Sequence, residues 1–64
     1  MDNIKNKSNK DLIKFMIYSS FKVLQNKYDD DILKERIDVE NELDVRGGYY
    51  FVKSKLNKED LKEL

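Results

Sequence analysis

Residues 36–56 read RIDVENELDVRGGYYFVKSKL, and this stretch decides the predicted fold. At its centre is the pair Gly47-Gly48, and two glycines can take the positive φ angles of a two-residue type I′ turn. Apolar residues alternate with acids before the pair, and the β-prone run YYFVK follows it. The pattern predicts an antiparallel β-hairpin with one apolar face. Across that face Val45 pairs with Tyr50, Leu43 with Val52 and Val39 with Leu56.

The other face of the predicted hairpin is acidic and aromatic. Four carboxylates would project from the first strand at intervals of about 7 Å, and a row at that pitch can imitate the phosphates of a nucleic acid. Two aromatic rings and an arginine share this face, and such side chains are typical of protein–protein interfaces. An ordinary solvated strand face is the alternative. The predicted partner-binding residues are Arg46, Tyr49, Phe51, Asp38, Glu40, Glu42 and Asp44.

Residues 37–45 also fit a helix, because Val39 and Leu43 then lie on one face. The glutamates of this segment favour a helix, whereas its β-branched residues favour a strand. The YYFVK strand needs a partner for its backbone hydrogen bonds, and this favours the hairpin. The alternative fold is an αα-hairpin with Gly47 as its C-cap, followed by an intermolecular strand.

Residues 9–28 predict the longest helix, with Ser8 or Asn9 as its N-cap. At 100° per residue, its apolar side chains cover about two thirds of the circumference. One face of a hairpin cannot cover so wide an arc. Either the C-terminal helix covers the remainder, or the helix packs against a second copy or a partner. The residues expected at an oligomer interface are Leu12, Phe15, Met16 and Val23.

Two short helices complete the predicted fold. Residues 29–36 form one, with Asp29 as its N-cap and further acids near the positive end of the helix dipole. Residues 57–64 form the other, with Asn57 as its N-cap. Residues 1–8 are polar and expected to be flexible. The predicted fold class is therefore α+β, in the order long helix, short helix, β-hairpin, short helix.

The length of 64 residues allows one domain, residues 1–64, with a small core. The chain has no cysteine, which excludes disulfides and thiolate metal sites, and no histidine, the commonest general base. Gly47-Gly48 lacks the GK[ST] that a phosphate-binding loop needs. The consecutive acids at 29–31 lack the ligand spacing of an EF-hand. We expect no catalytic site, no metal site, no cofactor and no small-molecule substrate.

Formal charge balances at 13 basic and 13 acidic residues, but its distribution is uneven. Residues 1–28 carry six lysines against two aspartates, whereas residues 29–46 carry eight acids against three bases. A dipolar chain of this kind suits a protein partner or a homodimer better than non-specific binding of DNA. No apolar run reaches the ~20 residues of a membrane span, and the lysine-rich N-terminus does not predict a secretory signal. We therefore expect a cytoplasmic protein.

The leading functional hypothesis is a small non-enzymatic regulator or inhibitor that binds a protein through the acidic and aromatic hairpin face. Lysine outnumbers arginine 11 to 2, which favours an AT-rich coding sequence and hence a phage or plasmid protein. The alternative is a nucleic-acid-binding regulator of transcription or recombination. A hairpin followed by the helix KEDL resembles small winged-helix excisionase-type regulators over about the last 18 residues. The hairpin would then act as a wing, and the N-terminal lysines would contact phosphates.

Overall fold

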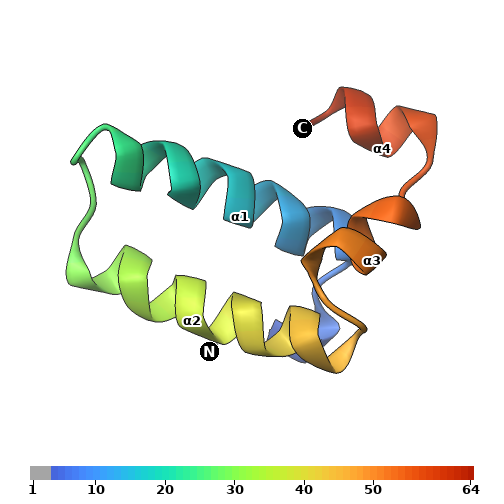
Figure 1. Ribbon diagram of the computed structural model, residues 1–64, viewed down its shortest axis with the longest axis horizontal. Helices are drawn as coiled ribbons and strands as arrows, with labels where there is room; N and C mark the ends of the chain where they lie inside the picture. Colours follow the sequence, from blue (N-terminus) through green and yellow to red (C-terminus); the bar gives the residue numbers. More distant parts are fainter. Residues whose placement is uncertain (1–3) are drawn as a thin grey trace.

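All secondary structure in the computed structural model, which describes residues 4–64, is helical, and the predicted β-hairpin is absent from these residues. A short 3₁₀ helix, η1, precedes the α-helices (Figure 1). The bounds are Ile4–Asn6 for η1, Asn9–Leu24 for α1, Asp30–Val45 for α2, Tyr49–Ser54 for α3 and Lys58–Lys62 for α4. The α+β prediction is therefore wrong, and the described chain has an all-α fold.

Helix α1 begins and ends at local signals in the sequence. The Ser8 hydroxyl accepts a hydrogen bond from the backbone N–H of Asp11 at 3.1 Å, which confirms the predicted N-cap. The helix ends at Leu24, before the predicted position, because Asn26 takes a left-handed conformation with φ 57°. The N–H groups of Asn26 and Lys27 then donate to carbonyls of the last helical turn, in a Schellman motif.

Helix α2 occupies both the predicted short helix and the predicted first strand. Asp29 caps it, since its carboxylate accepts a hydrogen bond from the N–H of Ile32 at 2.9 Å. The acids at its start complement the helix dipole, and its glutamates favour a helical backbone. One helical face buries Val39 and Leu43 in the core. Burial of this stripe outweighs the β preference of the branched residues, so the predicted strand 37–45 is wrong.

Gly47 and Gly48 end α2 instead of closing a hairpin. Gly47 has φ 114°, and the two glycine N–H groups donate to the carbonyls of Asp44 at 3.1 Å and Leu43 at 2.7 Å. This is again a Schellman motif, the same arrangement that ends α1. A Cβ atom at Gly47 would overlap the ring of Phe51, so glycine is needed there for space as well as for φ. The predicted type I′ turn is therefore wrong.

The alternative αα-hairpin with Gly47 as its C-cap matches α1 and α2, but its intermolecular strand is wrong. The β-prone run YYFVKS forms α3, with Gly48 as its N-cap residue. A helix of six residues is not stable alone, because it makes too few backbone hydrogen bonds for the order that it imposes. Val52 of α3 is buried in the core, so tertiary packing sets the conformation of this segment.

Helices α1 and α2 run antiparallel, and α3 crosses one end of the pair (Figure 1). Helix α4 is capped by Asn57, as predicted, and an ion pair between Lys10 and Glu63 connects its end to α1. Helix α3 covers only one end of the α1–α2 pair. The other end of the pair is left uncovered by α3. The buried core lies between α1, α2 and α3 and consists of Leu12, Ile13, Met16, Val39, Leu43 and Val52.

Arg46 ties the N-terminal segment to α1 and α2. Its guanidinium donates to the Glu42 carboxylate at 2.8 Å, to the Asn9 side chain at 2.8 Å and to the backbone carbonyl of Lys5 at 3.0 Å. These bonds hold η1 against the end of α2. The segment predicted to be flexible includes residues 1–3, which lie outside the described residues.

Candidate functional site

The structure does not gather the predicted partner-binding residues on one surface. In the predicted strand, alternate residues would lie on one face, so these side chains would be close together. In the observed helix, the same residues point to different sides. Asp38 lines a hollow beside η1, whereas Glu40 and Asp44 line a hollow on the α3 side of α2. Glu42 and Arg46 form a largely buried ion pair at 2.8 Å. The predicted row of carboxylates at strand spacing is therefore absent from the described residues. The hypothesis that these carboxylates imitate the phosphates of a nucleic acid depended on that row.

The two predicted aromatic contacts lie on α3 and have different neighbours. Tyr49 packs against the core, and the Lys53 amine lies 5.9 Å from its ring centroid. Phe51 is half exposed beside Gly47, and the Lys55 amine lies 4.5 Å from its ring centroid. A cation over an exposed aromatic ring contributes about 0.5–1 kcal/mol. These contacts stabilise α3, and a role of either ring in binding a partner stays a prediction.

Two of the four residues expected at an oligomer interface lie inside the chain itself. Leu12 and Met16 are buried in the core, and Phe15 packs against it with the Tyr18 ring centroid 6.2 Å away. Val23 is more than one third exposed near the end of α1. Helix α2 of the same chain thus covers part of the apolar arc that could have faced a second copy. A role of these residues in an oligomer stays a prediction.

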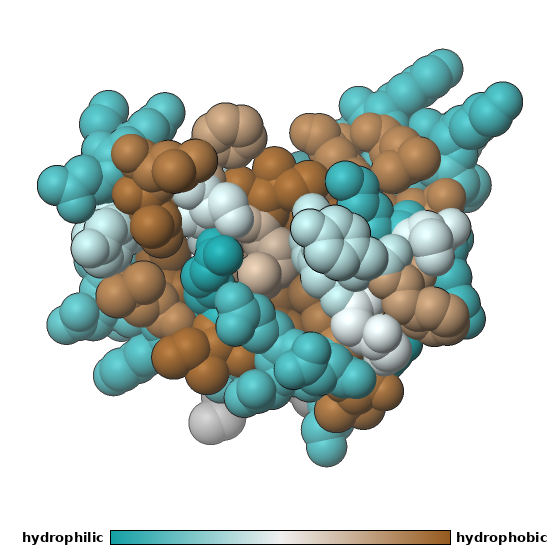
Figure 2. Space-filling model, in the orientation of Figure 1, coloured by the Kyte–Doolittle hydropathy of each residue, from teal (hydrophilic) through white to brown (hydrophobic). Residues whose placement is uncertain are grey.

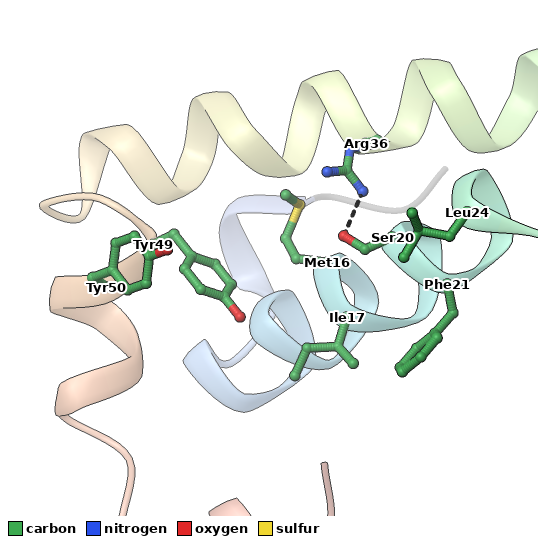
Figure 3. A pocket seen from close by; sticks show the side chains of 8 residues that line it. All are labelled: Met16, Ile17, Ser20, Phe21, Leu24, Arg36, Tyr49 and Tyr50. Carbon is green, nitrogen blue, oxygen red and sulfur yellow. Dashed lines mark hydrogen bonds between the residues drawn. The ribbon is translucent and has the colours of Figure 1, made fainter.

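An open groove of about 380 Å³ lies where α3 leaves the α1–α2 pair uncovered. Helix α1 supplies one wall, α2 an arginine, Arg36, and α3 two tyrosines, Tyr49 and Tyr50, at one end (Figure 3). The space-filling view shows the hollow between apolar side chains and the aromatic end (Figure 2). The wall from α1 consists of Met16, Ile17, Ser20, Phe21 and Leu24.

Three of the side chains that line the groove expose most of their surface. The exposed fractions are 60% for Phe21, 81% for Leu24 and 83% for Tyr50. Within residues 4–64, eleven large apolar side chains are exposed and six are buried in the core. A domain of this size gains limited stability from its own core.

Arg36 reaches the groove between α1 and α2 because small side chains lie opposite it. Its Nη1 donates to the hydroxyl of Ser19 at 2.8 Å. The same nitrogen donates to the hydroxyl of Ser20 at 3.0 Å (Figure 3). Ser19 is fully buried and donates in turn to the backbone carbonyl of Met16 at 3.1 Å. The Arg36 Nε lies 3.5 Å from the Glu40 carboxylate. The serine pair thus makes room for a guanidinium at the contact between two helices.

A second charged contact lies at the N-terminal end of α1. Lys10 and Glu63 form a hydrogen-bonded ion pair between α1 and the residue after α4. The hydrogen bond and the charge of Lys10 lower the pKa of Glu63 below its ordinary value of 4.5. The same hydrogen bond and the charge of Glu63 raise the pKa of Lys10 above its ordinary value of 10.5. This contact connects two helices and does not line the groove.

Sequence reasoning predicted the unusually wide apolar face of α1 but missed Arg36 and Tyr50. Tyr50 was assigned to the apolar face of the predicted hairpin, and Arg36 was the last residue of the predicted short helix 29–36 and was given no role. A helical signal was present, since the residues of α2 and its C-cap that contact α1 or the core recur at intervals of three and four. They are Arg36, Val39, Leu43 and Arg46.

Comparison with protein-family models, with curated proteins and with solved structures finds no match to this chain. No helix within residues 4–64 is long and apolar enough to cross a membrane. In the same part of the chain, no three carboxylates gather as they would around a metal ion. Function is therefore inferred from the groove itself.

Proposed function

We propose that this chain is a small non-enzymatic regulator or inhibitor whose groove binds an apolar helix of a partner protein. The observation that supports this function is the open apolar wall of α1. Its residues Ile17, Phe21 and Leu24 have the i, i+4, i+7 spacing of one helical face, and the last two are largely exposed. An amphipathic helix that docks in an apolar groove lays its own apolar face against a wall of this kind. Tyr50 adds an exposed aromatic ring, a residue type enriched at the centres of interfaces.

The hairpin face has no part in this proposal, because residues 37–54 are helical apart from the turn between α2 and α3. The alternative function, nucleic-acid binding, required the hairpin as a wing, and the same residues are helical. A cytoplasmic location belongs to the proposal, and the absence of cysteine is compatible with it.

Two matched variants test the groove. Leu24 and Val45 are the last residues of α1 and α2, and each is 81% exposed, but only Leu24 lines the groove. Leu24→Asp places a charge in the proposed contact, whereas Val45→Asp makes the same chemical change at an equivalent helix position elsewhere. Circular dichroism would establish that both variants keep the helical fold.

Affinity capture from the cells that express the chain then compares the two variants with the unmodified protein. We expect a partner that the unmodified chain and Val45→Asp retain and that Leu24→Asp loses by about tenfold or more, since a buried charge opposes apolar docking. Equal capture by the two variants would exclude the groove as the binding site.

A further inference from the structure

The polar groups that line the groove are hydrogen-bond donors or hydroxyls, and none is a carboxylate. Arg36 supplies a guanidinium, Ser20 a hydroxyl, and Tyr49 and Tyr50 their phenols. Within the described residues, the Ser20 hydroxyl already accepts a hydrogen bond from Arg36. The other groups, set among apolar side chains, are complementary to an acceptor with negative charge.

The positive charge of Arg36 is incompletely compensated in the described chain. Both hydrogen bonds of its Nη1 go to neutral serine hydroxyls. Its one carboxylate neighbour, Glu40, is 3.5 Å from Nε, and about half of the Glu40 side chain is exposed to solvent. The second amino group, Nη2, has no hydrogen-bond partner within residues 4–64. Arg36 thus keeps a donor for a ligand while the serines hold it in place (Figure 3).

A partner that covers the groove removes water from Arg36. Burial of a guanidinium without a matching carboxylate carries a desolvation penalty, whereas a carboxylate in contact with it forms a charge-assisted hydrogen bond. The groove therefore discriminates between partners of equal apolar surface according to their charge.

We propose that the groove binds an amphipathic helix of a partner protein that carries an aspartate or glutamate among its apolar anchors, and that Arg36 binds this carboxylate. The inference rests on the proposed function and specifies the chemistry of the partner. The apolar anchors contact Ile17, Phe21 and Leu24, and the carboxylate meets Nη2 of Arg36.

A second copy of the chain is the other occupant that the test must distinguish. Helix α2 is its acid-rich helix, and two of the seven carboxylates of α2 are paired within the chain. Glu40 is paired with its own Arg36, and Glu42 with Arg46. Sedimentation velocity at micromolar concentration is expected to show a monomer. A dimer that Phe21→Ser dissociates would overturn the proposal, because a second copy would then fill the groove.

A pair of small probes tests the charge preference without knowledge of the partner. 3-Phenylpropionate carries an aromatic ring and a carboxylate, and 3-phenylpropionamide has the same ring and chain with a neutral amide in place of the carboxylate. Nuclear magnetic resonance titrations would follow the backbone amides of Ile17, Phe21 and Tyr49 and the Nε–H group of Arg36. We expect the acid to shift these signals at millimolar concentration and to bind about five- to tenfold more tightly than the amide.

Each outcome of the titration has a distinct meaning. Equal affinity of acid and amide for the groove would overturn the charge preference and leave the proposed apolar contact standing. Failure of both probes to shift the groove signals would count against the charge preference and against the proposed function together.

Two charge-removing variants complete the test. Arg36→Gln is expected to abolish the preference for the acid, while the glutamine amide can still donate to a serine hydroxyl. Lys34→Gln removes the same charge from an exposed position of α2 and is expected to leave the preference unchanged. A preference that survives Arg36→Gln in a folded protein would overturn the assignment of Arg36. If Arg36→Gln unfolds, the comparison of the acid and the amide on the unmodified chain still tests the charge preference of the groove.

Discussion

Gly47 and Gly48 are adjacent and both have positive φ, but their surroundings differ. A Cβ atom at Gly47 would overlap the ring of Phe51, whereas one at Gly48 would meet nothing within 4 Å. We predict that Gly47→Ala lowers the free energy of unfolding by about 2–3 kcal/mol and Gly48→Ala by about 1 kcal/mol. Urea unfolding followed by circular dichroism would measure both. Equal losses would contradict the steric part of the prediction.

Asn26 is the other residue whose backbone conformation ends a helix. Its φ of 57° is left-handed, and glycine adopts this region without the strain that a side chain causes. Asn26→Gly is therefore expected to raise the free energy of unfolding by a few tenths to about 1 kcal/mol. Gln25→Gly is the control, because Gln25 has a right-handed conformation, and we expect it to lower stability slightly. The opposite order in thermal unfolding would show that the strain at Asn26 is negligible.

At the scale of the helix, the sequence predicted those elements whose signals are local. Ser8, Asp29 and Asn57 each accept the hydrogen bond of an N-cap, as expected from the residue types at these positions. The three helices that they begin were predicted, although the end of α1 was placed too late and the end of α2 too early, at residue 36. An asparagine is less common than a glycine as the left-handed residue after the C-cap, and Asn26 was therefore interpreted as part of the helix.

Residues 37–54 could not be assigned from local signals, because two periodicities compete there. Alternation predicts a strand, and the interval between Val39 and Leu43 predicts a helix. The choice depends on which partner buries the apolar side chains, and that partner is α1. Once the glycines are a C-cap, YYFVKS follows as α3, and Tyr50 becomes part of the groove. The part of the candidate site on α1 could therefore be predicted from the sequence, whereas the parts on α2 and α3 could not.

The contact between α4 and α1 predicts a dependence on pH. Pairing with Lys10 lowers the pKa of Glu63, so the ionised pair stabilises the folded chain above the ordinary pKa of 4.5. That contribution is lost as pH falls through the lowered pKa. Carboxyl nuclear magnetic resonance is expected to show a Glu63 midpoint below 4.5, which Lys10→Gln moves back towards the ordinary value. An unchanged midpoint in Lys10→Gln would show that the pair is not formed in solution.

The whole molecule depends on few buried side chains. A chain of 64 residues has a free energy of unfolding of about 3–10 kcal/mol, and removal of a buried leucine costs about 2–5 kcal/mol. Leu43 is fully buried, whereas Leu61 is 44% exposed. We predict that Leu43→Ala is largely unfolded near 37 °C and that Leu61→Ala remains folded. Thermal unfolding followed by circular dichroism would compare them. Similar midpoints of thermal unfolding for the two variants would show that Leu43 is not central to the core.

The lengths of α3 and α4 set how long their hydrogen bonds last. Helices of six and five residues are too short to be stable alone and depend on tertiary contacts. We therefore expect their amide hydrogens to exchange with solvent faster than those in the middle of α1 and α2. Mass spectrometry of hydrogen–deuterium exchange would measure the difference. Uniform protection across the helices would show that the chain opens as one unit.

Local opening of α3 has a consequence for the groove, because Tyr49 and Tyr50 form one of its ends. When α3 detaches, that end moves away while Arg36 and the α1 wall stay in place. The groove would then exchange between a closed and an open form, and under the proposed function a bulky partner helix would enter through the open form. The rate constant for association would then lie below the diffusion limit. Variants whose α3 amides exchange faster with solvent would associate faster.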